Sequence, residues 1–286
     1  MNGVGANKAA MSALRHLNAS DHAAQVVENR LSSGLKISSA KDNGATWSIA
    51  QKQRAEIRGL DVVGESLSRA QSTVETAIEG AERIREILMQ LKQLALAASD
   101  RSLDTARRTA LDVEFVDLRN DINVVANNTT FAGSNMIRGG RTAAQLGRSV
   151  TPLGDADGGS KIVVAAENLG LFHATNNPTS RLTLSTNSRI NTLARATTMI
   201  ATVDNSLQAL SAAVGRLGVG AKALEQHADF TSKLRDSLQA GVSHLVDADL
   251  GKESARLQAI QARQDLGRRS VQLANAAPAA VLALFR

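Results

Sequence analysis

The sequence predicts a mainly α-helical protein, built as an elongated antiparallel coiled-coil bundle of long helices, with paired terminal helices and a small β-containing insertion. Two heptad tracks of eleven positions each, far apart in the chain, step alternately by three and four residues without a slip. This 3.5-residue period is typical of coiled coils, where one apolar stripe faces a partner helix. Aromatic residues make up only 2% of the 286 residues, which favours thin helix–helix seams over deep pockets.

The first helix, to about residue 33, has a weak heptad with Asp21 and Glu28 at seam positions. So polar a segment is marginal as an isolated helix, and we expect it to order on meeting partners. Ser32-Ser33-Gly34 ends it, and residues 38–44 are expected to form a loop. Its apolar positions are Leu14, Leu17, Ala24, Val27 and Leu31.

The two tracks predict two long helices. The first ends near residue 98, and the second spans about 189–239. At a rise of about 1.5 Å per residue, each track is roughly 50 Å long. The first track is Leu60, Val63, Leu67, Ala70, Val74, Ala77, Ala81, Ile84, Leu88, Leu91 and Ala95. The second track is Leu193, Ala196, Ile200, Val203, Leu207, Leu210, Val214, Leu217, Ala221, Leu224 and Ala228.

Between them, Asp104 is the expected N-cap of a third helix over about 104–126. From about 131 to 187 the chain becomes rich in Gly, Thr and Asn, and two short strands are predicted, at 161–165 and 181–185. A last helix is expected over about 247–285, with Arg269 interrupting its apolar line and Pro278 straining its end. The apolar stripe of the third helix is Leu111, Phe115, Leu118, Ile122 and Val125.

Composition excludes several classes of function. The chain has no cysteine, so disulfides, thiolate metal sites and cysteine catalysis are excluded. No stretch approaches the roughly 20 apolar residues of a membrane span, so no membrane insertion is expected. Residues 1–20 lack a basic segment followed by an apolar run, so we expect no cleaved signal peptide. The net charge is +6, but the basic residues are interleaved with acidic ones, as in residues 79–86. This pattern does not favour nucleic-acid binding.

No arrangement of residues predicts catalysis, a metal or a cofactor. None of the five histidines forms an H-x-x-x-H pair. Gly215-x-x-Gly218-x-Gly220 falls inside the second long helix, so it indicates a flexing point or a close helix contact rather than a dinucleotide site. Asp247 and Asp249 suit helix caps or pairing between subunits better than acid–base chemistry.

The chain resembles the bacterial flagellins, particularly the short alphaproteobacterial type. The resemblance covers residues 1–137 and 190–286 in matching order, and the ordered set of motifs is more specific than any one of them. The motifs are Arg30–Ile37 with Ser39–Ala45, Arg54–Leu60, Phe131–Gly133, Asp247–Gln258 and Gln272–Asn275 continuing to Leu282, Leu284 and Phe285.

The resemblance implies a non-enzymatic structural subunit of the extracellular flagellar filament, without cofactor. Such a subunit is exported unfolded and polymerises with itself or with other flagellins. Its implied partners are an export chaperone, the type III export apparatus, the filament cap and the hook-junction proteins. The division expected is a filament core of residues 1–40 and 247–286, a rod domain of 41–137 and 188–246, and a surface-exposed β insertion of 138–187. The expected interface residues are Leu14, Leu17, Arg30, Leu31, Arg54, Arg58, Asp247, Asp249, Leu250, Leu257, Leu266, Leu273 and Leu284.

Some positions depart from the family pattern. His16, Asp21, His22 and Arg269 make the terminal helices more polar than in the family, so a major and a minor filament subunit are both open interpretations. The vertebrate immune-receptor motif maps to residues 88–94, where the family's central Arg and Glu are replaced by Gln90 and Gln93, before Leu94. Because charge-assisted hydrogen bonds are lost there, weak receptor activation is expected.

Two alternatives to a filament subunit stay open from the sequence alone. One is a flagellin-like hook–filament junction protein, which shares both terminal signatures. The other is a cell-surface protein on a flagellin scaffold that holds a ligand with residues 138–187.

Overall fold

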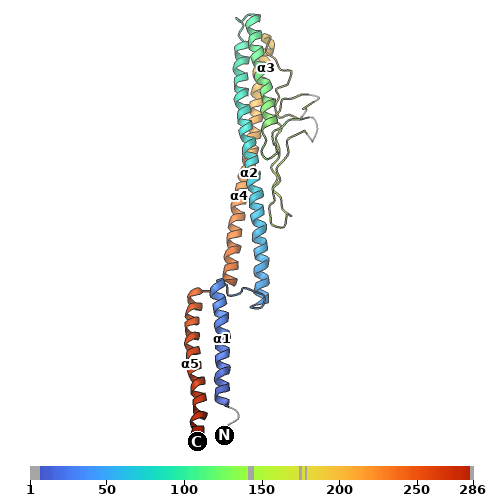
Figure 1. Ribbon diagram of the computed structural model, residues 1–286. Coiled ribbons are helices and arrows are strands. Elements are labelled where there is room, and N and C mark those ends of the chain that lie inside the picture. Colours follow the sequence, from blue (N-terminus) through green and yellow to red (C-terminus); the bar gives the residue numbers. More distant parts are fainter. Residues whose placement is uncertain (1–6, 141–144, 174–175, 178, 284–286) are drawn as a thin grey trace. The chain divides into compact units, whose positions relative to one another are not determined.

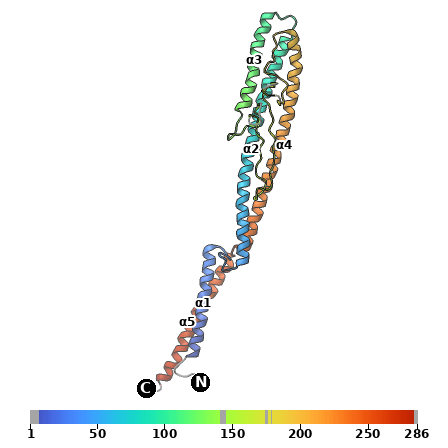
Figure 2. The same ribbon diagram turned by 90° about the vertical axis from the view of Figure 1, so that its right-hand side faces the viewer.

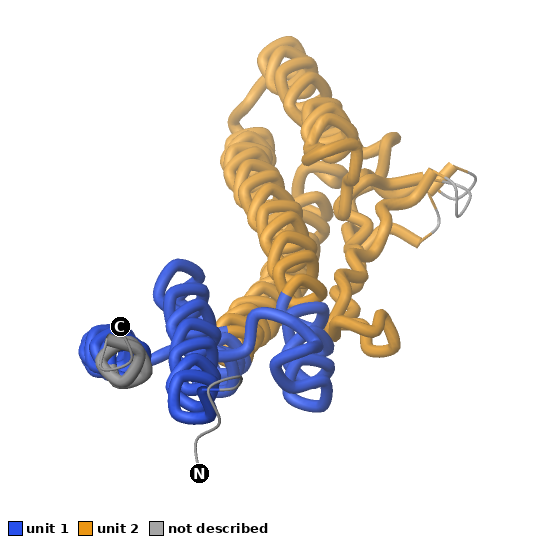
Figure 3. Tube along the Cα trace, turned by 60° about the horizontal axis from the view of Figure 1, so that its bottom comes forward, with its two compact units in different colours: residues 1–57, 236–286 blue, residues 58–235 orange. Residues whose placement is uncertain are grey.

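The computed structural model describes residues 7–140, 145–173, 176–177 and 179–283, with side chains up to residue 276. Figure 1 shows its five helices. They are α1 (Lys8–Ser33), α2 (Gly44–Ala98), α3 (Thr105–Asn128), α4 (Leu193–Val246) and α5 (Leu250–Ala283). The chain divides into two compact units, coloured separately in Figure 3: unit 1 comprises residues 1–57 and 236–286, and unit 2 comprises residues 58–235. Within the described ranges, no helix is both long and apolar enough to cross a membrane.

Short polar side chains fix the helix ends. Asn7 caps α1, its side-chain oxygen accepting the Ala10 N–H at 3.0 Å, and Gly34 ends the helix at a left-handed φ of 70°. Asn43 caps α2 through the Thr46 N–H at 3.1 Å. The predicted cap Asp104 is confirmed, since it accepts the Arg107 N–H at 2.7 Å.

In unit 2, α2 and α4 lie side by side and antiparallel, as the two views of Figures 1 and 2 agree. Two ion pairs show the register: Asp61 with Arg235 at 3.6 Å, and Lys92 with Asp204 at 2.6 Å. Moving 31 residues forward along α2, from 61 to 92, moves the partner 31 residues back along α4, from 235 to 204. This is the pairing that the two heptad tracks predict.

All eleven positions of the first track are buried. On α4 only Ala196, Val203, Leu210, Leu217 and Leu224 are buried, and the other six track positions are half-buried. Met199, Ser206 and Ala213 complete the buried line instead. The buried face of α4 is shifted toward these three residues because residues 183 and 184 pack on that side of the helix. There the Ser206 hydroxyl accepts the N–H groups of Thr183 and Leu184 at 3.2 and 3.1 Å.

Helix α3 buries charged residues that its apolar stripe does not predict. Phe115 and Ile122 are buried as expected, but so are Arg108, Asp112 and Arg119. Arg108 donates to the carbonyls of residues 98, 100 and 103 at 2.8–3.1 Å, which closes the turn from α2 into α3. Asp112 accepts the N–H of Ile190 at 2.7 Å, and Arg119 donates to the carbonyl of Ser188 at 2.6 Å. These polar groups attach the chain before α4 to α3.

The predicted β insertion is wrong for the described residues, which contain isolated bridges but no strand. Val150 bridges Val164, Leu153 bridges Lys161, and Phe172 bridges Ser185. At residues 183 and 184 the backbone N–H groups donate to Ser206 of α4 and not to a neighbouring strand, so a regular ladder does not extend there. A Cβ on Gly220 would lie 2.5 Å from the Val164 side chain, so this glycine of the α4 Gly motif marks a close contact.

Glu167 attaches this segment to α4 through charged hydrogen bonds. Its side chain is 2% exposed, and Arg216 of α4 donates to both carboxylate oxygens, at 2.6 and 2.9 Å. Arg181 donates a third hydrogen bond at 3.0 Å. Burial, the largest single influence, raises the pKa of Glu167. The hydrogen bonds and charges of Arg216 and Arg181 together outweigh it, so this pKa lies below its ordinary value.

Candidate functional site: the surface of the terminal helix pair

In unit 1, α1 and α5 pack against each other along a thin seam. Its buried apolar side chains are Ala24, Val27 and Ile260, with Ala23 and Leu257 partly buried against them. Alanine contributes little area, and a seam with three buried side chains stabilises a helix pair only weakly. The pair is therefore short of apolar contacts for its length.

Polar contacts supplement the seam at three points along the pair. Asn7 Nδ2 donates to the carbonyl of Ala274 at 2.7 Å, and Gln264 Nε2 donates to Asp21 Oδ1 at 2.8 Å. Asp21, which the sequence places at a seam position, is thus satisfied by α5. The positions run in opposite directions along the two helices, so α1 and α5 are antiparallel.

The third contact, between Arg30 and Glu253, forms only one of the two hydrogen bonds that such a pair can make. Arg30 Nη1 lies 3.3 Å from Glu253 Oε1, while Arg30 Nε and Glu253 Oε2 are buried without a hydrogen-bond partner. A guanidinium and a carboxylate can form two parallel hydrogen bonds, and an unsatisfied buried polar atom is costly. The sequence singles out Arg30 but not its partner Glu253.

Large apolar side chains of the same two helices remain exposed. Leu266 and Leu273 of α5 are 63% and 76% exposed, and Leu14 of α1 is 49% exposed. Exposed apolar side chains gathered on one element mark interaction surfaces in soluble proteins. The remaining members of this set are Met11, Leu31 and Leu250.

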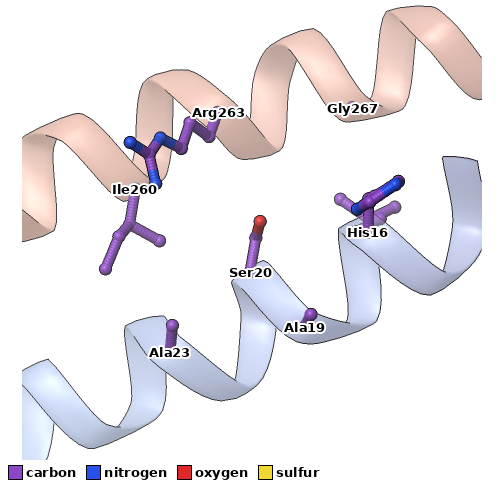
Figure 4. A pocket seen from close by; sticks show the side chains of 8 residues that line it. His16, Ala19, Ser20, Ala23, Ile260, Arg263 and Gly267 are labelled. Carbon is purple, nitrogen blue, oxygen red and sulfur yellow. The ribbon is translucent and has the colours of Figure 1, made fainter.

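A shallow groove of about 430 Å³ runs between α1 and α5 (Figure 4). His16, Ala19, Ser20 and Ala23 line it from α1, and Ile260, Arg263 and Gly267 from α5. Among the residues that the structure describes, no group of three or more histidine, aspartate or glutamate side chains could hold a metal ion.

The chain next to the pair forms a second small core. Ile37, Ala50, Val242 and Val246 are buried in it, and Trp47 packs against them. The Val246 carbonyl accepts the N–H groups of Lys36 and Ile37 at 2.7 and 3.2 Å. Asp249 accepts the Lys252 N–H at 3.0 Å, which is the cap geometry expected for one of the two aspartates.

The structure places the predicted interface residues in different surroundings. Leu17, Leu257, Arg30 and Arg54 are half-buried, and Arg58 and Asp247 are exposed. Leu284 lies outside the described residues. The sequence pattern does not point to Asn7, Gln264 or Glu253 as contact residues, because each is one polar side chain among many on two weakly patterned helices.

Comparison with known proteins places both terminal helices within matches to one family. Two family models match: the bacterial flagellin N-terminal helical region over residues 4–142, and the bacterial flagellin C-terminal helical region over residues 200–285. The chain is 40% identical to Flagellin FljO of Caulobacter vibrioides over 286 residues, covering 100% of this chain and 99% of that protein. It is 30% identical to a flagellin of Brucella melitensis, covering 98% of each.

Among solved structures, the chain is similar in fold to a Vibrio parahaemolyticus protein described as flagellar hook-associated. The TM-score is 0.54 at 12% identity, with 72% of this chain and 100% of that chain covered. At this identity the similarity concerns the fold alone.

Proposed function

The chain belongs to the bacterial flagellin family and is a non-enzymatic structural subunit of the flagellar filament, and we propose that it polymerises through α1 and α5. The observation that supports this most directly is the exposure of Leu266 and Leu273 on a helix pair with a thin seam. A neighbouring copy that covers these leucines removes their apolar surface from water. The interface also includes Leu14, Leu17, Leu31, Leu250 and Leu257, and Leu284 near the C-terminus.

Ordering and binding are coupled in this proposal. The pair has few buried side chains of its own, so it is marginal in a free monomer. Docking onto a growing tip supplies the missing apolar contacts, and it also gives Arg30 and Glu253 the surroundings to complete their pairing. Monomers therefore stay soluble until a tip is present.

The proposal extends to the route and the layers of the filament. The chain is exported unfolded to the cell exterior through the flagellar type III apparatus, with an export chaperone, and is added beneath the cap beyond the hook-junction proteins. Residues 1–40 and 247–286 form the filament core, residues 41–137 and 188–246 surround it, and residues 138–187 face outward.

Arg54, Arg58 and Asp247 extend the interface beyond the leucines. Arg54 and Arg58 are four residues apart on α2, so they share one helix face. We assign them to ion pairs with carboxylates of a neighbouring copy. Charge reversal by Arg58→Glu is the variant that tests this assignment, and unchanged polymerisation would contradict it.

Seeded polymerisation tests the role of the terminal helices. We expect the full chain to elongate filament fragments into long tubes, seen by electron microscopy, and a chain lacking residues 1–33 and 250–286 to form none. The rest of α2 and α4 keeps its own core, so circular dichroism of the truncated chain should retain a cooperative helical transition. Filaments from the truncated chain would contradict the proposal.

A separate prediction concerns the immune-receptor motif at residues 88–94 of α2. Gln90 and Gln93 are exposed and Leu94 is half-buried. We expect weak activation of the vertebrate flagellin receptor, and a rise of roughly tenfold in potency for the variant Gln90→Arg with Gln93→Glu, because each restores a charge-assisted hydrogen bond. A receptor reporter assay measures this, with Gln90→Ala as the control. A potent response to the unaltered protein would defeat the prediction.

A further inference from the structure

Two helix faces of unit 2 each expose a pair of apolar side chains eleven residues apart. On α3 these are Val113 and Val124, 58% and 54% exposed; on α4 they are Val219 and Phe230, 73% and 57% exposed. Eleven residues are close to three helical turns, so the members of each pair point the same way and lie roughly 16 Å apart. The two faces thus present apolar positions with equal spacing.

The charges between these positions are of opposite sign. The α3 face carries Asp117 and Asp121, and the α4 face carries Lys222; all three are exposed. Within the described part of the chain, none of the three forms an ion pair or a side-chain hydrogen bond, whereas nearby Lys233 is already paired with Asp229 at 2.6 Å. Unpaired charges of opposite sign favour contact between the two faces.

The ring of Phe230 lies beside a second ring of the same helix. Its centroid lies 6.0 Å from that of His227, whose Nε2 is 2.7 Å from the carbonyl of Gly154. Aromatic side chains are enriched at protein interfaces, because each one removes a large apolar area from water on binding.

The helix directions also fit. Arg108 binds Ala98, and Gly80 lies beside Thr129, so α3 runs back along α2 and therefore parallel to α4 (Figure 2). Heterologous contacts that build an open helical filament leave every copy pointing the same way. The α3 face of one copy and the α4 face of the next are then parallel, which sets Val113 beside Val219 and Val124 beside Phe230.

Parallel pairing brings the charges together as well. Lys222 lies roughly 60° to one side of the Val219–Phe230 line, and Asp117 lies roughly 40° to the other side of the Val113–Val124 line, at about 100° per residue. When two helices face each other in parallel, these two flanks adjoin. Lys222 and Asp117 also follow Val219 and Val113 by three and four residues, so they lie at nearly the same height.

The two faces of one copy are too far apart along the helices to meet each other. Val113, five residues after Arg108, lies level with Lys92 of α2, which pairs with Asp204 of α4. Val219 is fifteen residues beyond Asp204, or roughly 22 Å at 1.5 Å per residue. Only a neighbour displaced by this distance along the long helices brings the faces together.

We propose that the α4 face of Val219, Lys222 and Phe230 binds the α3 face of Val113, Asp117 and Val124 of a second copy, in parallel and displaced by roughly 22 Å. This contact rests on the polymerisation proposed above and adds a lateral interface in unit 2 to the contacts of α1 and α5.

Cysteine cross-linking tests the register, because the chain has no cysteine of its own. The matched variant is Val113→Cys with Val219→Cys, and the mismatched control is Val113→Cys with Phe230→Cys. After treatment with a short bis-maleimide, filaments of the matched variant should give a ladder of covalent oligomers at least tenfold more abundant than in the control or in dissociated monomers. Equal cross-linking of both variants, or none in matched filaments, would overturn the register.

Charge exchange is a second test that does not depend on cysteine chemistry. We expect Lys222→Glu and Asp117→Lys each to raise the critical concentration for polymerisation roughly fivefold, and the double variant to return most of the way to the unaltered value. Additive losses, or no change, would overturn the contact.

If these variants behave as the unaltered chain while removal of α1 and α5 abolishes filaments, the lateral contact fails and the proposed function stands. Filaments from chains without α1 and α5 would instead contradict the proposed role of the terminal helices.

Discussion

The variant Leu266→Ala with Leu273→Ala is expected to polymerise only at several-hundredfold higher concentration than the unaltered chain. Burying a leucine side chain contributes about 2 kcal/mol, so the loss of two at one interface removes roughly 4 kcal/mol, and each 1.4 kcal/mol is tenfold in affinity. Both leucines are mostly exposed in the single chain, and alanine has the higher helix propensity. The monomer should therefore melt as before, while the critical concentration measured by sedimentation rises.

A matched control comes from the same helix. Gln261→Ala with Gln272→Ala changes two exposed side chains of α5 without removing apolar surface. We expect its critical concentration to stay within about threefold of the unaltered value. If the glutamine variant is impaired as much as the leucine variant, the effect is a general one on α5 rather than burial of the two leucines.

The variant Glu167→Gln is expected to lower the free energy of unfolding of unit 2 by about 3 kcal/mol, the size typical of a broken buried ion pair. The neutral amide gives up the charge-assisted hydrogen bonds with Arg216 and Arg181, and it places an N–H₂ group against a guanidinium donor. Thermal unfolding followed by circular dichroism measures this. Glu65→Gln is the control: its side chain is 74% exposed beside Arg69, and a change below about 0.5 kcal/mol is expected.

The same carboxylate gives the stability of unit 2 a defined pH dependence. Its pKa in the folded chain is lowered, so the ionised form is favoured by folding. The stabilisation is fully present above the ordinary glutamate pKa of about 4.3 and is lost as the pH falls through the lower folded value. The difference in stability between the unaltered chain and Glu167→Gln should shrink over that acid range. A difference that is constant from pH 7 down to pH 2 would contradict this assignment.

The sequence by itself determined the long helices, their pairing and the family. A coiled-coil seam depends only on the spacing of apolar residues along one helix. The first track could therefore be assigned position by position, and every one of its residues is buried. The caps are equally local: Asp104 acts on an N–H three residues away. The weak apolar pattern of the terminal helices is also visible in the sequence, because polar residues such as Asp21 occupy seam positions.

Only the tertiary structure decided where the buried charges and the irregular segment lie. Glu167 meets Arg216 across 49 residues, and Asp112 meets Ile190 across 78, so the sequence around each charged residue indicates a solvated side chain. The alternation at Leu182 and Leu184 predicts a strand, yet both leucines are buried without a ladder, and the backbone N–H of Leu184 is bonded to Ser206. The physical reason is the same in each case. A periodic pattern records the side chains of one element, whereas the partner of a buried polar group or a backbone N–H is chosen only when distant segments pack together.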